Sequence, residues 1–290
     1  MTNKEIRNQA WDLLWHKNWV SKLILISSAL QLSASLIMGA VTDTLKTIGV
    51  VNINETLRLL ERDGFLIFFD SPLEYLTVAA MYLFFSFLMT GIVNFGICKT
   101  LNNVADNNQE GYIKSAFAAF KMPFEVFNLQ FLFTSITFLF VLVCTAPFLF
   151  YAFKSSWPHM PELINVNNPL VSFVFICVAI IAVILAITIP FYRFRYIFRV
   201  KADHPEWPAS KCLSYSNYLT LGNKARLIKL DLSYLKAYLV PLAIPLISLS
   251  VFSIMIFSLA LTVATLYNGI GQSILYRQLL AEKESSPSLA

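Results

Sequence analysis

Long apolar runs separated by shorter polar segments dominate the chain. A helix of about 20 predominantly apolar residues crosses the roughly 30 Å hydrocarbon core of a bilayer. Runs of that length predict membrane-spanning helices at residues 19–40, 75–97, 127–151 and 170–191. The pattern therefore predicts an all-α fold, a polytopic transmembrane helical bundle.

The last apolar run, residues 238–267, leaves the number of spans open. It is longer than one perpendicular crossing requires, and Pro241 and Pro245 interrupt its start. It is either one long tilted helix or the end of a fifth helix that begins near residue 225 and is followed by a sixth. We therefore expect five or six spans.

Amphipathic helices are predicted beside the spans. Trp11, Trp15 and Trp19 recur every four residues, so they share one side of a helix that leads into the membrane. Tryptophan favours the membrane–water interface, where its ring is buried and its N–H stays hydrated. A second such helix, at residues 113–123, is expected to turn Phe117 and Phe120 toward the bilayer.

Composition supports the same class of protein. Hydrophobic residues make up 57% of the chain and charged residues 13%, whereas soluble domains are about 25% charged. We expect a single integral-membrane domain over residues 1–282, with a cytoplasmic loop at about 191–236 and a disordered tail at 283–290.

The distribution of Lys and Arg predicts the orientation. The N-terminal segment through Lys22, the loop at 98–123 and the segment at 191–236 together carry sixteen of these residues, against four in the alternate loops. Because cytoplasmic loops are enriched in Lys and Arg, the N-terminus is predicted to be cytoplasmic. The C-terminus is then cytoplasmic with six spans and external with five.

A basic-aromatic segment, residues 190–236, holds nine of the 22 Lys and Arg residues. One interpretation is a helix emerging from the membrane with an aromatic belt and snorkelling arginines. The other is attraction to anionic lipid head groups, worth about 1 kcal/mol per cation. The candidate head-group contacts are Arg193, Arg195, Arg199 and Lys201. Nucleic-acid binding is not expected, because lipid accounts for the aromatic rings.

Catalytic motifs are missing from the sequence. The three histidines are isolated, the four cysteines form no Cys-x-x-Cys pair, and Gly269-x-Gly271 has no strand before it. We predict no catalytic residue, no metal site and no cofactor. Asp231 is expected to form an interfacial ion pair beside Arg226 and Lys229.

The predicted spans carry amides rather than charges. Gln31 and Asn94 are the candidate intramembrane polar contacts, and Asn94 lies between Gly91 and Gly96, where helices could approach closely. Asn128 and Gln130 are two further amides. Transporters that couple to ions usually place ionisable groups within their spans.

A family resemblance rests mainly on the basic-aromatic segment. The matching positions are Pro190, Tyr192, Tyr196, residues 203–205, Ala209, Ser216, residues 222–223 and residues 230–233, with weaker agreement at Arg7, Ala10, Leu14, Asn18, Trp19, Tyr267, Tyr276 and Leu279. Two departures are Lys17, where glycine is frequent, and residues 240–245, which replace a glycine-rich turn. On these residues the chain resembles the family called domain of unknown function 975. The resemblance implies a multi-pass protein of the bacterial cytoplasmic (inner) membrane and brings no established activity.

The preferred hypothesis is a non-enzymatic membrane protein that organises or assists membrane partners or lipids. Its expected partners are membrane lipids, anionic ones in particular, and another membrane protein. The alternative is a transporter or permease component for an apolar or lipid-like substrate, which a cavity lined by the intramembrane amides would favour. A lipid hydrolase or transferase would need polar residues to converge, such as Asp231 with His204.

Overall fold

The computed structural model describes residues 1–15, 72–106, 112–154, 169–247 and 251–285, together with residues 22, 24, 26, 27, 36, 39 and 40. Within these residues every regular element is a helix, which confirms the all-α prediction. Gln31 and most of the first predicted span lie outside the described residues. The helices are α1 (Asn3–Trp15), α5 (Pro72–Ala105), α6 (Tyr112–Ala116), the 3-10 helix η2 (Ala118–Lys121), α7 (Pro123–Lys154), α8 (Pro169–Arg193), α9 (Ile197–Asp203), α10 (Ala209–Thr220), α11 (Lys224–Ile247) and α12 (Val251–Glu284).

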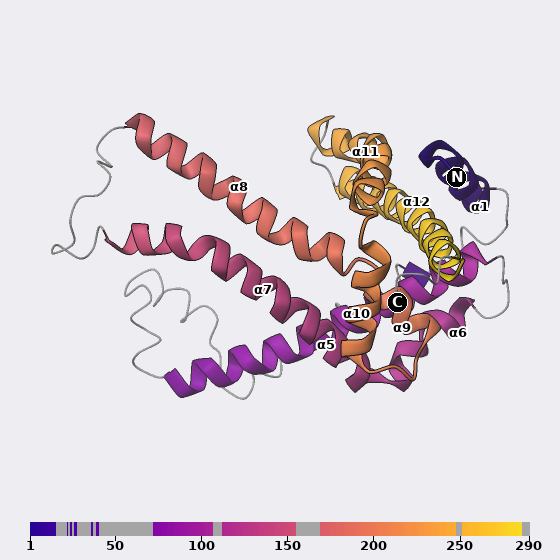
Figure 1. Cartoon of the computed structure of the whole chain (residues 1–290), viewed down its shortest axis with the longest axis horizontal. Coiled ribbons are helices and arrows are strands. Elements are labelled where there is room, and N and C mark those ends of the chain that lie inside the picture. Colours follow the sequence, from indigo (N-terminus) through magenta and orange to yellow (C-terminus); the bar gives the residue numbers. More distant parts are fainter. Residues whose placement is uncertain are drawn as a thin grey trace.

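Three segments among the described residues are long and apolar enough to cross a membrane: Ala80–Ala105, Pro123–Ala146 and Cys177–Asp203. In Figure 1, α7 and α8 extend side by side away from α1, α11 and α12, and they pack against each other. Large apolar side chains such as Phe138 and Ile184 are exposed on their outer surfaces. An exposed apolar surface of this kind suits contact with lipid, and it indicates a membrane protein. The count of five or six spans stays a prediction.

From residue 224 onward, the described residues form two helices. α11 begins at Lys224 and α12 begins at Val251, and the two pack against each other. One long helix over residues 238–267 is therefore wrong, and the alternative of two successive helices holds. Pro241 and Pro245 lie within α11. α12 continues to Glu284, two residues beyond the predicted end of the domain.

Helix α1 covers one side of α12. Its buried face includes Ile6, Ala10 and Leu14, as its amphipathic pattern requires. The Trp11 ring meets the Tyr267 ring edge-on at 5.4 Å between centroids. Trp11 itself is half exposed, and its insertion into the membrane interface stays a prediction.

Two glycines allow α12 to approach two neighbours closely. A Cβ atom on Gly271 would lie 2.0 Å from the hydroxyl oxygen of Tyr234 on α11. A Cβ atom on Gly269 would lie 2.6 Å from Cδ1 of Leu101 on α5. The Gly269-x-Gly271 pattern therefore serves helix packing, since a Cβ at either position would force the neighbouring side chain to move.

The basic-aromatic segment folds into the end of α8, the short helices α9 and α10, and the start of α11. The chain leaves helical geometry at residues 194–196, between α8 and α9. A single helix emerging from the membrane through Arg193, Arg195 and Arg199 is therefore not what this segment forms.

Helix α10 satisfies backbone groups at this break. The Ser216 hydroxyl accepts a hydrogen bond from the Tyr196 N–H at 3.1 Å, and the Thr220 hydroxyl donates to the Arg193 carbonyl at 2.9 Å. Both side chains are fully buried. Buried backbone groups need such partners because water cannot reach them. Gly222, with φ 83°, then ends the α10 region in the left-handed conformation, which glycine adopts readily.

Replacing the buried hydroxyl at the break should destabilise the protein. Ser216→Ala leaves the Tyr196 N–H without its acceptor, which costs about 1–3 kcal/mol. Thermal unfolding in detergent should show a clear loss of melting temperature. The matched control is Ser233→Ala, since the Ser233 hydroxyl donates only to the Leu230 carbonyl of its own helix. Equal melting temperatures for the two variants would contradict the role given to Ser216.

Adding a methyl group at the α11–α12 contact should also destabilise the fold. Gly271→Ala forces its Cβ against Tyr234, and overpacking of this kind costs about 1–3 kcal/mol. Adding Tyr234→Phe should recover part of the loss, because it removes the nearest atom. Gly39→Ala is the control, since a Cβ there meets nothing within 4 Å. No difference in thermal melting between the Gly271 and Gly39 variants would show that the helices do not approach closely.

Candidate functional site

The predicted head-group cations lie in different environments. Arg193 is exposed, and its Nε donates to Oδ1 of Asn217 at 2.8 Å. The side chain of Arg195 is 11% exposed, and Arg199 and Lys201 are 6% and 2% exposed. Their contact with lipid head groups stays a prediction. Burial nevertheless means that a ligand of Arg195 or Arg199 must enter the protein rather than lie on its surface.

Asp231 on α11 gathers one part of the polar interior. It accepts hydrogen bonds from Arg195 NH2 at 2.7 Å, Tyr192 OH at 2.8 Å and Gln272 Nε2 at 2.8 Å. Asp231 thus forms the expected ion pair, but its partner is Arg195 rather than Arg226 or Lys229, its neighbours in the chain. Arg226 instead bonds Glu282, because α12 passes beside the start of α11.

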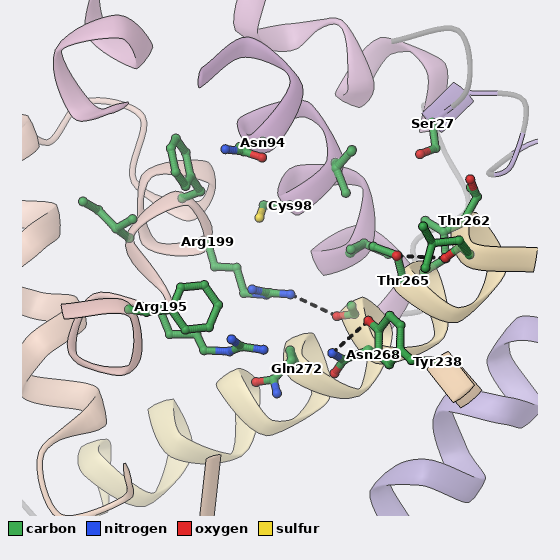
Figure 2. Close-up of a pocket in the computed structure, with 18 of the residues that line it drawn as sticks. Ser27, Asn94, Cys98, Arg195, Arg199, Tyr238, Thr262, Thr265, Asn268 and Gln272 are labelled. Atoms are coloured by element: carbon green, nitrogen blue, oxygen red, sulfur yellow. Dashed lines mark hydrogen bonds between the residues drawn. The ribbon is translucent and has the colours of Figure 1, made fainter. Parts of the chain in front are cut away.

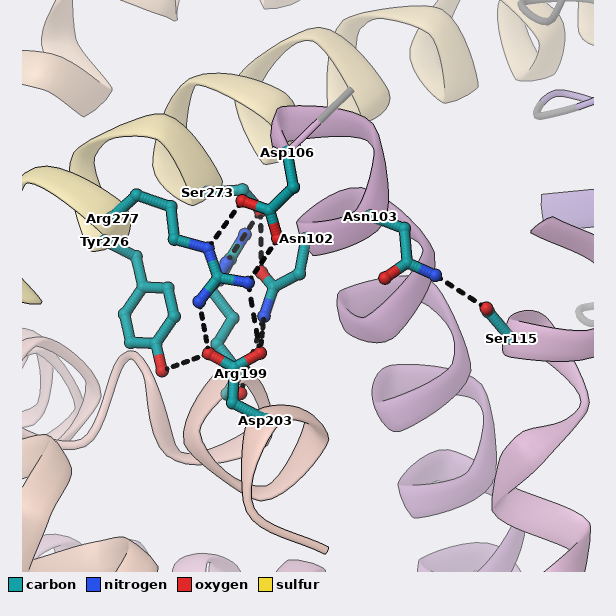
Figure 3. A network of polar contacts seen from close by, with 9 residues as sticks. All are labelled: Asn102, Asn103, Asp106, Ser115, Arg199, Asp203, Ser273, Tyr276 and Arg277. Carbon is teal, nitrogen blue, oxygen red and sulfur yellow. Dashed lines mark hydrogen bonds and ion pairs between the residues drawn. The ribbon is translucent and has the colours of Figure 1, made fainter. Parts of the chain in front are cut away.

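Asp203, at the end of α9, gathers the second part (Figure 3). It pairs with Arg277 at 2.5 Å, and it accepts hydrogen bonds from Tyr276 OH at 2.8 Å and from Asn102 Nδ2 at 3.2 Å. Arg277 also bonds both carboxylate oxygens of Asp106, at 2.5 and 2.8 Å. One guanidinium thus joins the ends of α5 and α9 to α12.

A chain of neutral groups connects Arg199 to this second part. Arg199 Nε donates to the Ser273 hydroxyl at 3.1 Å, and that hydroxyl donates to Asn102 Oδ1 at 3.2 Å. Arg199 NH2 also donates to the Gly269 carbonyl at 3.0 Å. No carboxylate of the described residues forms an ion pair with Arg199. The nearest link to a carboxylate is indirect: Ser273 and Asn102 connect Arg199 to Asp203 by hydrogen bonds.

The polar interior as a whole has no net charge. Three arginines, Arg195, Arg199 and Arg277, lie beside three aspartates: Asp203 and Asp231, which are largely buried, and Asp106, which is more exposed. A buried charge is costly unless it is paired and hydrogen-bonded. Because the positive and negative charges of this set are equal in number, these side chains can lie together between α5, α8, α9, α11 and α12.

Protonation states in the second part follow from burial and from Asp203. Burial, then the charge of Asp203 and its hydrogen bond, raise the pKa of Tyr276, so the phenol remains a donor at neutral pH. Burial by itself would lower the pKa of Arg277. The hydrogen bond to Asp106 and the charge of Asp203 outweigh it and raise the pKa, which keeps the guanidinium charged.

Lys201 uses its ammonium group inside the protein. Its Nζ donates to the carbonyls of Pro205 at 2.6 Å and Trp207 at 2.8 Å, and it pairs with Glu125 on α7 at 2.5 Å. A lysine has three N–H donors, and all three are taken. Lys201 therefore holds the turn between α9 and α10 against α7.

A cavity of about 460 Å³ lies beside the polar interior (Figure 2). It is partly open, and its size falls within the roughly 300–1,000 Å³ of small-molecule sites. Helices α5, α7, α8, α9, α11 and α12 contribute to its walls. It is lined by Ser27, Asn94, Ile97, Cys98, Leu101, Phe133, Phe191, Phe194, Arg195, Ile197, Phe198, Arg199, Tyr238, Ser258, Leu261, Thr262, Thr265, Leu266, Asn268, Gly269 and Gln272.

Of the predicted polar contacts in the membrane, Asn94 can be placed. Asn94 lines the cavity, and its Nδ2 donates to Oε1 of Gln130 on α7 at 3.4 Å. A Cβ on Gly91, one turn earlier, would lie 3.1 Å from Val126, so α5 and α7 approach closely there.

The Asp231–His204 pair that a lipid hydrolase would need is not assembled in the described residues. His204 stacks on Trp207 at 3.9 Å and approaches Glu206. The described residues also hold no group of three His, Cys, Asp or Glu side chains that could bind a metal. All four cysteines are free, and burial raises the pKa of the Cys212 thiol, which makes it a poor nucleophile.

The polar face of α12 was missed in the sequence. Asn268, Gln272 and Ser273, followed by Tyr276 and Arg277, repeat at intervals of about four residues and so share one side of the helix. That spacing was a usable signal.

These features define an all-helical membrane protein with a charge-balanced polar interior next to an apolar cavity. Residues 1–283 match the family described as Protein of unknown function (DUF975), and the chain belongs to this family. The resemblance seen in the sequence is thereby confirmed. No curated protein and no solved structure matches the chain.

The two carboxylates that bind Arg277 should differ in their effect on stability. The Asp203 side chain is 19% exposed and the Asp106 side chain 39%. Asp203→Asn also weakens the bond from Tyr276, so we expect a loss of about 3 kcal/mol, close to that of a broken buried pair. Asp106→Asn should cost about 1 kcal/mol or less, as for a surface pair. Thermal unfolding in detergent tests the order, and a larger loss for Asp106→Asn would contradict it.

Proposed function

We propose that this protein is a non-enzymatic, multi-pass protein of the bacterial cytoplasmic membrane that holds a lipid in its interior cavity. Through that lipid it organises or assists the lipids and protein partners around it. Its N-terminus is cytoplasmic in this proposal. The orientation is supported by the sixteen Lys and Arg residues on the proposed cytoplasmic side against four on the other.

The cavity is the observation that carries the proposal. Aromatic and aliphatic side chains such as Phe133, Phe198 and Leu261 form much of its lining, and polar groups gather where Arg199 and Gln272 lie. A site with an apolar body and a polar end matches an amphiphile. The exposed apolar surfaces of α7 and α8 would place lipid around the same helices.

Hydroxyl groups on the α12 wall do not make it polar. The Thr262 hydroxyl donates to the Ser258 carbonyl, and the Thr265 hydroxyl donates to the Leu261 carbonyl, each at 2.9 Å. Each hydrogen bond stays within the helix, so the side chains need no polar ligand. This wall therefore suits an acyl chain.

A transporter or permease component for a lipid-like substrate is the second candidate. Asn94 lines the cavity and bonds Gln130, as that hypothesis required of an intramembrane amide. Both candidates need lipid in the cavity. They differ in whether the lipid crosses the membrane, and lipid translocation measured with purified protein in vesicles separates them.

Lipid in the cavity should be detectable by crosslinking. Bacteria grown with a diazirine fatty acid incorporate it into phospholipid, and irradiation should couple lipid to peptides containing residues 258–266 of α12. Thr262→Trp fills the cavity, so it should lower both this crosslinking and the total phospholipid retained after purification by about tenfold. Native mass spectrometry measures the retained lipid.

The control is Ile184→Trp, at an exposed position of α8 outside the cavity lining. It should retain as much lipid as the unsubstituted protein. Equal retention by the Thr262 and Ile184 variants, with crosslinks spread evenly over the apolar helices, would overturn the proposed function.

A further inference from the structure

We propose that the polar end of the cavity is a binding site for the head group of an anionic phospholipid, and that Arg199 holds its phosphate. This inference rests on the proposed function and names the class of lipid. Three independent features of the structure support it: the free donors of Arg199, the sign of the charge in the cavity lining, and the position of the polar end.

Arg199 has guanidinium N–H groups at the cavity that are not used in hydrogen bonds with the described residues. An arginine carries five N–H groups in a planar fork that suits phosphate oxygens. Two of them bond Ser273 and Gly269, and the other three have no acceptor among the described residues. Arg199 as a residue is only 6% exposed, so bulk water solvates it poorly. A phosphate in the cavity would supply both acceptors and the opposite charge.

Neighbouring cations are less suited to this role. Arg195 also lines the cavity, but it is paired with Asp231 at 2.7 Å. Lys201 has its three donors in use, and neither it nor the exposed Arg193 is part of the lining. Arg199 is therefore the one described cation that both lines the cavity and lacks a carboxylate partner.

The sign of the charge favours an anionic head group over a zwitterionic one. The charged side chains in the lining are Arg195 and Arg199, and the described lining contains no carboxylate. Asp231 bonds Arg195 from outside the lining. A head group with a terminal ammonium would meet two arginines and find no carboxylate. A head group that bears only a phosphate charge has no such penalty.

The position of the polar end agrees with a lipid of the cytoplasmic leaflet. Along α12 the lining runs from Ser258 to Gln272, which at 1.5 Å per residue is about 21 Å. This compares with about 15 Å for the hydrocarbon depth of one leaflet. In the proposed orientation the end near Gln272 and Arg199 is cytoplasmic. A lipid with its head group there would point its chains toward the apolar lining near Leu261.

Competition between two defined lipids tests the inference. The full-length protein in detergent is mixed with equal amounts of phosphatidylglycerol and phosphatidylcholine, and native mass spectrometry measures how much of each is retained. The unsubstituted protein should prefer phosphatidylglycerol by about tenfold, as expected for a charge-assisted pair. Arg199→Gln should reduce that preference to about one while total lipid is kept. Arg193→Gln is the matched control, and it should keep the full preference.

Arg199→Gln also removes bonds to Ser273 and Gly269, so it can impair folding. Two measurements keep the test decisive in that case. Arg199→Lys keeps the charge but loses the planar fork, and it should show a reduced preference that remains above one. In the unsubstituted protein, a diazirine phosphatidylglycerol should crosslink to peptides containing residues 197–201 more than the matching phosphatidylcholine does.

The outcomes separate this inference from the proposed function. Equal retention of the two lipids by the unsubstituted protein, or an undiminished preference in a folded Arg199→Gln variant, would overturn the inference and leave lipid binding intact. If the unsubstituted protein retained neither lipid, both the inference and the proposed function would be contradicted. A last measurement compares inorganic phosphate with phosphatidylglycerol by their effect on the melting temperature. If inorganic phosphate raised the melting temperature as much as phosphatidylglycerol does, and only when Arg199 is present, the site would bind a soluble anion and the lipid assignment would be wrong.

Discussion

The balance between three interior arginines and three aspartates governs how the helices of this protein meet. Arg195 pairs with Asp231, Arg277 pairs with Asp203 and Asp106, and Arg199 reaches Asn102 through Ser273. An unpaired charge in an apolar interior is costly. Each helix must therefore pack so that its charged side chain lies next to its partner on the neighbouring helix. α12 contributes to every one of these contacts except the Arg195–Asp231 pair, and there Gln272 bonds the same carboxylate. The C-terminal helix is thus the element around which the others are arranged.

Close packing and the break after α8 make this arrangement possible. Gly269 and Gly271 remove the side chains that would hold α5 and α11 away from α12. The irregular residues 194–196 allow Arg195 to point toward Asp231 while Arg199 points toward Ser273. Backbone N–H and C=O groups without hydrogen bonds would be costly in this buried break. Ser216 and Thr220 of α10 supply hydrogen-bond partners for two of them. The short helices α9 and α10 are therefore integral to the core rather than an appended loop.

The cavity follows from the same constraint. The polar groups that join the helices on the α9 side also form the polar end of the cavity, while the longer apolar parts of α5, α7 and α12 form its walls. A single arrangement therefore supplies both an apolar space and a cation at one end of it. This is why Arg199, although it is buried, remains available to an amphiphile in the cavity. Lys201 shows the contrast, since its three donors are consumed by the fold.

Much of the fold could be predicted from the sequence, because the signals involved are local. Apolar runs indicated the helical class and the membrane character, and the segment from Pro190 carried the family resemblance. Local signals also explain why the partner of Asp231 was not predicted. Arg226 and Lys229 are its neighbours in the chain, whereas its partner Arg195 lies 36 residues away. Asp106 and Arg277 are separated by 171 residues, and nothing in hydropathy relates them. The sequence by itself thus determined the all-helical class and where the long apolar helices of the described residues lie. Only the tertiary structure decided which charges meet and where a cavity remains, because both depend on helices that come together in space from distant parts of the chain.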